Sequence, residues 1–499
     1  MDHDDTTSSD PKTEPRPLGE RLAALAAGLA HQALDSQELD WVLVGGLCEL
    51  ACAADPTMSD LATTALYTRA VERLCDDFSQ AGVWATNRLL ACLIQEVRRR
   101  LPWGQELDRR LAEHGLASPA QLVERCELLA RPRPVENRHR VERCLVLSRV
   151  TIGADIAITS VLLQRLAAAF PAAELVLVAP RKQAQLFGGW PRLSLVPMEY
   201  PRGGGLAARL GQWPALHDQV RLLAGSAPDD GRTLLFDPDS RLTQLGLLPA
   251  LHADCTRLFP SRQALPGLLG PSLSALANDW LDSVLGPGPF AWPAVWLAPE
   301  DQARAAAFRS RLTAAGCRHL VVVNLGVGGN DRKRVAGDFE AQLVCGLARM
   351  RPDTVVVLDC GAGDEGVARC RLVLDEAAGQ GLASCLVREA EILERLPVQG
   401  CGVIGVQGSL ATVAGLINVA DGFLGYDSAC GHLAAALARP AVTIFAGAPH
   451  RRFIERWQPL SRAAGQTLVA EPEMAPAALV GQVETAMATV LAAAAGSRP

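Results

Sequence analysis

The chain has 499 residues, of which 49% are hydrophobic and 20% are charged, and its formal net charge is −6. A chain of this length exceeds one ordinary core, so we expect two or three domains. The composition excludes a disordered chain, and the negative net charge argues against nucleic acid as a partner. No uncharged apolar run reaches the ~18 residues that a membrane-spanning helix needs, so at most peripheral membrane association is expected.

The first 17 residues are polar and acidic and lack the apolar core of a secretion signal. We expect residues 1–17 to form a disordered tail and the protein to be cytoplasmic. The 14 cysteines include no Cys-x-x-Cys pair, and a long chain without an export signal does not fit a disulfide scaffold. We therefore expect buried, unpaired cysteines, no zinc or other metal, and no cofactor.

Residues 18–136 have the apolar spacing of helices and few strand signals. Within this stretch Ser59 is a candidate N-cap and Pro102 a candidate helix stop. The pattern predicts an all-α domain of five or six helices. No residues in it have catalytic spacing, so its expected role is contact with a partner or with other copies of the chain.

The pattern changes at Val141, where short apolar runs begin to alternate with helical segments. Strand, helix and strand joined by short connections predict βαβ units and a parallel sheet. Residues 141–286 are expected to form an N-terminal Rossmann-like domain. Its expected strands are 144–148, 174–179, 194–197 and 233–236, and its expected helices are 158–170 and 272–285.

A second set of strands and helices begins after the Gly-Pro-Gly-Pro linker at 286–289. Residues 299–460 are expected to form a C-terminal Rossmann-like domain, and residues 461–499 a helical segment. The expected strands are 319–324, 354–358, 402–406, 422–424 and 441–445, and the expected helices are 299–315, 339–350, 409–419 and 432–438. Open parallel sheets bind ligands at the carboxyl ends of their strands, so the two sheets predict a ligand-binding cleft between the domains.

Four loops at strand ends carry candidate site residues, and the first of them follows the strand at 144–148. Gly153 permits a tight turn there, and Asp155 lies near the start of the next helix. A carboxylate in that position suits a general base for an acceptor hydroxyl, or only a cap of the helix. The residues alone leave both roles open.

The second loop begins at Asn324, where the first strand of the C-terminal domain ends. Gly326, Gly328 and Gly329 free backbone N–H groups for phosphate oxygens, and Lys333 adds a compact positive charge. Lys333 is one of only three lysines in a chain with 45 arginines. This loop predicts a phosphate site, with a solvated charged surface as the alternative.

The third loop offers Asp364 and Glu365 after two glycines. Acidic side chains at a strand end hold ribose hydroxyls in dinucleotide-binding folds, and they also cap helices on the surface. In the fourth loop Asp427 and Ser428 lie where a strand gives way to a helix, and His432 lies in the first turn of that helix. The free N–H groups of such a turn favour an anionic diphosphate.

Taken in order, these loops resemble the heptosyltransferase-type glycosyltransferases, family 9 of the GT-B fold, over about residues 141–459. The N-terminal marks are Arg149, Gly153, Asp155 and the run Phe-Pro-Ala-Ala-Glu at 170–174. The C-terminal marks are Asp427, Ser428, His432, the run Ala-Ala-Ala-Leu at 434–437, Pro440 and Phe445.

The resemblance implies two Rossmann-like domains in a GT-B arrangement and an inverting, metal-independent sugar transfer from a nucleotide diphosphate, with ADP-heptose as a candidate donor. The acceptor would be a glycan of the lipopolysaccharide type, a natural product or a protein. The resemblance also implies Asp155 as the catalytic base and Lys333 as a ligand of the donor diphosphate. It implies donor-binding roles for Asp427, Ser428, His432 and, by a looser match, Glu365 near the ribose or base.

The sequence departs from the family pattern at three positions: Ala154 is inserted ahead of Asp155, Val335 replaces a tryptophan and Ala429 replaces a glycine. Cysteine-ligated iron, found in relatives that modify autotransporter proteins, is not expected without a Cys-x-x-Cys pair. Two other functions fit the same architecture. One is a nucleotide-sugar 2-epimerase, and the other is a non-catalytic nucleotide-sugar-binding or assembly protein with the helical domain as its partner surface.

Overall fold

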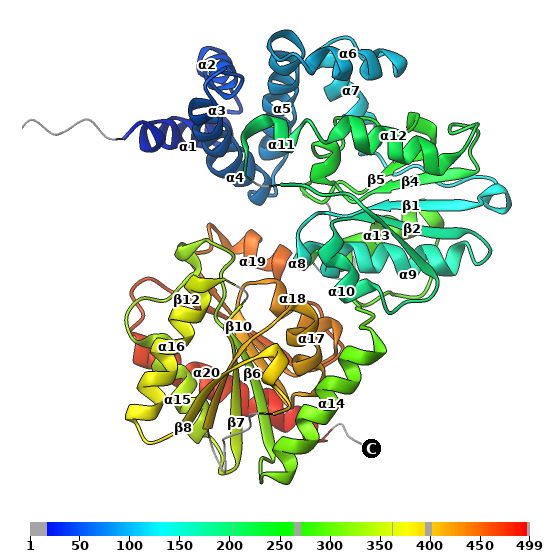
Figure 1. Ribbon diagram of the computed structural model, residues 1–499. Coiled ribbons are helices and arrows are strands. Elements are labelled where there is room, and N and C mark those ends of the chain that lie inside the picture. The colour runs from blue at the N-terminus through cyan, green and yellow to red at the C-terminus, as the bar shows by residue number, and fades with distance from the viewer. Residues whose placement is uncertain (1–16, 202, 264–270, 362, 395–401, 497–499) are drawn as a thin grey trace, which may run out of the picture.

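The computed structural model describes residues 17–201, 203–263, 271–361, 363–394 and 402–496. Figure 1 shows three parts, a bundle of helices from the N-terminal quarter and two sheets that are each flanked by helices. The expected fold class, an all-α domain followed by two Rossmann-like domains, is confirmed. The expected disordered tail at 1–17 lies outside the described residues, apart from Pro17.

The helical domain is built from short helices, several of which begin at a side-chain cap. Asp55, Ser79 and Ser118 each accept a hydrogen bond from a backbone N–H in the first turn of the helix that follows. Asp55 therefore takes the capping role expected of Ser59, whereas α5 ends just before Pro102 as expected. The elements are α1 (Leu18–Ser36), α2 (Trp41–Ala51), α3 (Pro56–Ala65), the π-helical turn η1 (Leu66–Val71), α4 (Glu72–Asp76), α5 (Gln80–Arg100), α6 (Gly104–Glu113) and α7 (Pro119–Leu129).

The N-terminal Rossmann-like domain has a five-stranded parallel sheet with the order β3-β2-β1-β4-β5. Its strands are β1 (Arg143–Leu147), β2 (Glu174–Ala179), β3 (Leu193–Pro197), β4 (Thr233–Asp237) and β5 (Thr256–Leu258). Its main helical elements are α8 (Ile152–Ala154), the π-helical turn η3 (Asp155–Thr159), α9 (Ser160–Ala169), α10 (Ala184–Phe187), α11 (Gly205–Arg209), α12 (Trp213–Ala224) and α13 (Leu273–Leu285). The helix expected at 158–170 thus begins earlier, at Ile152.

The C-terminal Rossmann-like domain has a seven-stranded parallel sheet with the order β12-β11-β10-β6-β7-β9-β8. Its strands are β6 (His319–Asn324), β7 (Thr354–Asp359), β8 (Ala383–Arg388), β9 (Gly402–Gln407), β10 (Gly422–Tyr426), β11 (Ala441–Ala446) and β12 (Gly465–Ala470). Its main helices are α14 (Pro299–Ala314), α15 (Phe339–Arg349), α16 (Asp364–Gly379), α17 (Leu410–Val419), α18 (Ala429–Ala436), α19 (Arg451–Trp457) and α20 (Pro476–Gly496).

Three strands of the two sheets were not expected from the sequence: β5, β8 and β12. All three are edge strands, and β5 is only three residues long. The outer strands β8 and β12 contain polar residues beside apolar ones and are only partly buried, so they lack the continuous apolar run of a central parallel strand. The segment 461–499 is therefore not wholly helical, because β12 pairs with β11 ahead of α20.

The helical domain and the N-terminal Rossmann-like domain share one apolar core. Leu145 and Leu147 of β1 pack into the core that contains the buried side chains of the helical domain. Cys144 and Val146, which point to the opposite face of the same strand, lie in a second core that continues into the C-terminal domain. One face of the first sheet thus lies in a core that it shares with α11, α12 and the helical domain.

Two helical stretches of the described chain, Ile152–Ala169 and Pro476–Ala494, are long and apolar enough to span a membrane by length and composition alone. Of the first stretch 67% is buried inside the fold, so it serves as a core helix of the N-terminal domain. The second is 28% buried and places Val483 and Met487 in the core of the C-terminal domain.

Two cysteines correct the expectation that the cysteines are unpaired. Cys360 follows β7, Cys370 lies on α16, and the two form a disulfide. The remaining described cysteines are free, and all of them except Cys92 and Cys385 are buried.

Candidate active site

The carboxyl ends of β6 and β10 lie side by side where the strand order of the second sheet reverses. Asn324, the last residue of β6, is buried, and its Oδ1 accepts a hydrogen bond from the Ser428 hydroxyl at 3.2 Å. Asn324 Nδ2 donates to Asp359 Oδ2 at the end of β7, at 2.6 Å. Ser428 also caps α18, since its Oγ accepts a hydrogen bond from Cys430 N. The predicted Asn324 and Ser428 are thus brought together at the edge where open parallel sheets bind ligands.

Lys333 lies at the same edge, on the 3₁₀ turn η7 (Asp331–Lys333). Its ammonium forms an ion pair with Asp427 and lies 3.4 Å from the backbone oxygen of Asp427. The ammonium also lies 5.5 Å from the centre of the Phe453 ring on α19. The side chain of Asp427 is 10% exposed, whereas that of Lys333 is 24% exposed. The ion pair therefore fixes the position of the Lys333 ammonium and leaves part of the lysine side chain exposed.

The loop from β6 to Lys333 contains the three predicted glycines. Gly328 and Gly329 have φ angles of 62° and 82°, and Gly326 lies against the Asn324 side chain. The far side of the loop is held by Gly447 after β11, where an added Cβ would lie 2.1 Å from the backbone oxygen of Arg332. Only glycine permits that approach, so Gly447 fixes the turn that carries the lysine.

His432 lies in the first turn of α18 and is buried. Its ring packs edge to face against Trp457 of α19, with 6.0 Å between the ring centres. Burial lowers the pKa of His432 to about 4, with Asp427 opposing and Lys333 reinforcing that shift. The imidazole is therefore neutral at pH 7, and it carries one N–H donor and one acceptor nitrogen.

The two Rossmann-like domains touch at Gly153. An added Cβ at Gly153 would lie 3.1 Å from His432 Cδ2 and 3.3 Å from Ala429 Cα. The loop after β1 therefore rests directly on the first turn of α18. The methyl group of Ala429 stands where the family pattern has a glycine, and in this chain it faces a position without a side chain.

Asp155 is wholly buried in the first turn of the long helix after β1. Its carboxylate accepts hydrogen bonds from the Ser148 hydroxyl at 2.6 Å, from Arg149 N at 2.7 Å, from the Thr159 hydroxyl at 2.7 Å and from the Gln183 amide. Burial raises the pKa of Asp155, and these hydrogen bonds oppose the rise.

This geometry corrects one of the two roles that the sequence suggested for Asp155, that of helix cap. Helix α8 has Thr151 at its N-cap, so Asp155 is not the cap. Both oxygens of Asp155 accept hydrogen bonds inside the fold, and its role as the general base stays a prediction. The carboxylate ties the turn after β1 to β1, η3 and the segment after β2.

The turn after β1 is also strained. Val150, a buried β-branched residue, has a φ of 60°. The Asp155 network holds it, because Val150 N donates to Ser148 Oγ at 2.8 Å. The preceding residue, Arg149, forms an ion pair at 3.6 Å with buried Asp239, which follows β4. Such strain persists where surrounding contacts fix the backbone, and it is frequent at functional sites.

Glu365 does not converge with the other predicted residues. It lies at the start of α16, its side chain is 80% exposed, and its carboxylate pairs with Arg369 at 3.5 Å. Asp359, at the end of the preceding strand, is the acidic residue of this loop that contacts the site. The sequence analysis also missed Phe453 and Trp457, because α19 follows β11 and contains none of the motif residues that indicated the site.

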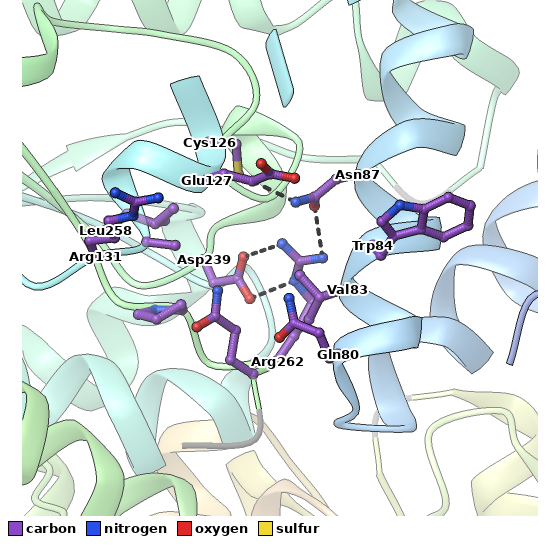
Figure 2. A pocket seen from close by; sticks show the side chains of 13 residues that line it. Gln80, Val83, Trp84, Asn87, Cys126, Glu127, Arg131, Asp239, Leu258 and Arg262 are labelled. Atoms are coloured by element: carbon purple, nitrogen blue, oxygen red, sulfur yellow. Dashed lines mark hydrogen bonds and ion pairs between the residues drawn. The ribbon is translucent and has the colours of Figure 1, made fainter. Parts of the chain in front are cut away.

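A cavity of about 280 Å³ lies elsewhere, between α5 and α7 of the helical domain and the segment after β5. Figure 2 shows its polar floor, where Arg262 is bonded both to Asp239 and to Asn87. None of the predicted donor-binding residues lines this cavity. Among the described residues, no group of three or more His, Cys, Asp or Glu side chains could hold a metal ion.

Comparison with known proteins gives a family and a fold. Residues 383–480 match the family model Glycosyltransferase family 9 (heptosyltransferase). The comparison with curated proteins found no match. Among solved structures, the glycosyl transferase family 9 protein from Veillonella parvula DSM 2008 is 14% identical, with a TM-score of 0.51 over 73% of this chain and 98% of that one.

Two further solved structures are similar at lower TM-scores. The E. coli ADP-heptose lps heptosyltransferase II is 18% identical, with a TM-score of 0.46 over 70% of this chain and 99% of that one. The E. coli heptosyltransferase WaaC with ADP is 16% identical, with a TM-score of 0.43 over 69% of this chain and 99% of that one.

The two parallel sheets, whose turns after β1 and β10 meet at Gly153 and Ala429, define a GT-B-type glycosyltransferase fold. The C-terminal domain, with β8 to β12 and the turn at Asp427, is a heptosyltransferase-like domain of glycosyltransferase family 9. The protein is therefore a heptosyltransferase-like glycosyltransferase. A helical domain precedes its two Rossmann-like domains in the chain.

Proposed function

We propose that this protein transfers a heptose from ADP-heptose to an acceptor hydroxyl with inversion at the anomeric carbon. The observation that carries the proposal is the meeting of Lys333, Asp427 and the capped start of α18 at the strand-order reversal of the second sheet. The family match runs through this turn, from β8 to the start of α20.

The donor diphosphate is proposed to lie between the Lys333 ammonium and the first turn of α18. A diphosphate is the anion that suits this position, because a lysine supplies a point charge and a helix start supplies free N–H groups. The ion pair with Asp427 holds Lys333 in place without burying it. Neutral His432 adds no positive charge, so its proposed role is to form the wall of the donor site together with Trp457.

In the proposed reaction, the acceptor oxygen attacks the anomeric carbon and the bond from that carbon to the diphosphate oxygen breaks. The electron pair of the broken bond leaves with ADP, where Lys333 and the helix start stabilise the added charge. The proton of the acceptor hydroxyl passes to a base.

The test is a thermal-shift screen with ADP-heptose and with ADP-, GDP-, UDP- and dTDP-sugars, followed by assay of ADP release. A ligand at 100 times its dissociation constant stabilises the folded protein by about 2.7 kcal/mol. We expect ADP-heptose to raise the melting temperature most and to release ADP only with the enzyme present. A screen in which no nucleotide sugar moves the melting temperature would rule the proposal out, and a donor isomerised without ADP release would identify an epimerase instead.

A further inference from the structure

Helix α19 carries two aromatic side chains of the proposed donor site. The Lys333 ammonium lies 5.5 Å from the centre of the Phe453 ring, and Trp457 packs edge to face against His432 with 6.0 Å between the ring centres. The position of α19 therefore sets where these two rings lie relative to the lysine and the first turn of α18. The helix has only seven residues, so contacts with other elements have to stabilise it.

Phe78, between α4 and α5 of the helical domain, supplies one of these contacts. Figure 1 shows α4 at the lower edge of the helical bundle, on the side toward α19. The Phe78 ring packs edge to face against Trp457, with 6.4 Å between the ring centres, and the Arg456 guanidinium lies 6.0 Å from the centre of the Phe78 ring. Trp457 thus contacts both the helical domain, through Phe78, and the proposed donor site, through His432.

Phe78 belongs to a different apolar core from the rest of its domain. It is 2% exposed and lies in the core that contains Phe453 and Leu433 of the C-terminal domain. No other described residue between positions 18 and 129 lies in that core, and the cluster of buried side chains from the helices packs against the N-terminal domain. Phe78 also has a φ of 54°, a conformation that costs a bulky residue free energy and persists where contacts impose it.

Asp77, the preceding residue, lies beside the start of α19. His450 is the N-cap of α19, and its Nδ1 accepts a hydrogen bond from Phe453 N at 3.0 Å. Burial lowers the pKa of His450, so the ring is neutral at pH 7. A neutral imidazole whose Nδ1 accepts carries its proton on Nε2, and that nitrogen lies 3.6 Å from Asp77 Oδ1. The Asp77 carboxylate therefore favours the tautomer of His450 that caps the helix.

We propose that Phe78 and Asp77 are positioning residues of the donor site, an inference that rests on the proposed function. Phe78 holds Trp457 against His432, and Asp77 holds the start of α19. Both residues act on the nucleotide through α19, so their loss lowers the affinity for the donor rather than the rate at which its bond breaks. The helical domain is thereby required for tight donor binding by the two Rossmann-like domains.

The proposal and a general contribution to stability predict different results. A buried ring that only stabilises the fold lowers the melting temperature and leaves the affinity of the folded protein for nucleotide unchanged. A ring that positions Trp457 changes that affinity. The matched control is Leu89→Ala, which also removes a buried apolar side chain from the helical domain, but one that lies on α5 in the core shared with the N-terminal domain.

The experiment is isothermal titration of ADP into the wild type and its variants, at a temperature at which circular dichroism shows each protein to be folded. We expect Phe78→Ala to bind ADP about 10-fold more weakly, a difference of about 1.4 kcal/mol, and Leu89→Ala to bind it as the wild type does. Phe78→Leu should be intermediate, because leucine fills part of the volume without the ring edge. With ADP-heptose, the loss should appear as a raised KM at an unchanged kcat.

Asp77→Ala tests the proposal independently of Phe78. It removes a side chain that is 18% exposed and lies outside the apolar core, and it should weaken ADP binding even where a Phe78 variant fails to fold. Wild-type affinity in folded Phe78→Leu and Asp77→Ala would overturn the proposal, and so would an equal loss of affinity in Leu89→Ala. Both of these results leave the transferase proposal standing if the wild type releases ADP from ADP-heptose. If the wild type neither binds ADP nor releases it from ADP-heptose, the proposed function itself fails.

Discussion

Replacing Asp155 with alanine should destabilise the protein rather than only inactivate it. The substitution removes the acceptor of four hydrogen bonds at a site with no exposed surface. The Ser148 and Thr159 hydroxyls can rotate to other acceptors, whereas Arg149 N and the Gln183 amide cannot. Each buried donor left unpaired costs about 1–3 kcal/mol, so with the cavity we expect a loss of about 3–5 kcal/mol.

Asparagine at the same position provides a matched comparison. Its amide oxygen replaces the oxygen that accepts from Arg149 N and Thr159, and its amide nitrogen faces Gln183. The Gln183 Oε1 is buried without a partner, so a flip of that side-chain amide would pair the two groups. We therefore expect Asp155→Asn to lose only about 1 kcal/mol.

The assay is urea unfolding followed by circular dichroism, together with ADP release from the folded fraction. The reasoning predicts a much lower urea midpoint for Asp155→Ala than for Asp155→Asn. It would be refuted if both variants unfolded with the wild type while ADP release fell about 10²-fold, because that pattern belongs to a catalytic base.

Two further predictions concern the contact between the Rossmann-like domains. Because burial depresses the pKa of His432 to about 4 from 6.5, its contribution to stability is complete above about pH 6.5 and is lost as the pH falls toward 4. Urea unfolding at pH 7 and pH 4.5 should show a loss of up to about 3 kcal/mol that His432→Gln reduces; an unchanged pH dependence in the variant would contradict the assignment. Gly153→Val should cost about 1–3 kcal/mol by forcing α18 away, measured as a lower calorimetric melting temperature; a melting temperature equal to that of the wild type would show that the contact is loose.

The sequence was sufficient for the elements and residues whose signal is local. Central strands such as β6 and β10 are continuous apolar runs, and the residues that follow them have to lie at one edge of a parallel sheet. For that reason the same edge of the sheet brings together Asn324, Lys333, Asp427, Ser428 and His432. The pairing of Lys333 with Asp427 joins residues 94 positions apart, and sheet topology alone accounts for it.

The rest depended on contacts between segments that have no local signature. The position of Asp155 suits a base after a strand end, and only the fold shows that Ser148, Thr159 and Gln183 surround it. Phe78 lies in a helical stretch without catalytic spacing, and its ring contacts Trp457, more than 370 residues later. Burial in an interdomain contact is not encoded in periodicity, so this contact could not be identified from the sequence.

The most direct test of the account is isothermal titration of ADP-heptose into the wild-type protein and two methionine variants. Lys333→Met removes the charge at the proposed diphosphate site and keeps most of the length of the side chain. Lys182→Met removes the charge of an exposed lysine in the N-terminal domain and is the control. The account predicts that the wild type and Lys182→Met bind alike and that Lys333→Met binds at least about 10-fold more weakly, a difference of about 1.4 kcal/mol. Equal affinity in all three proteins, or no binding to the wild type, would contradict it.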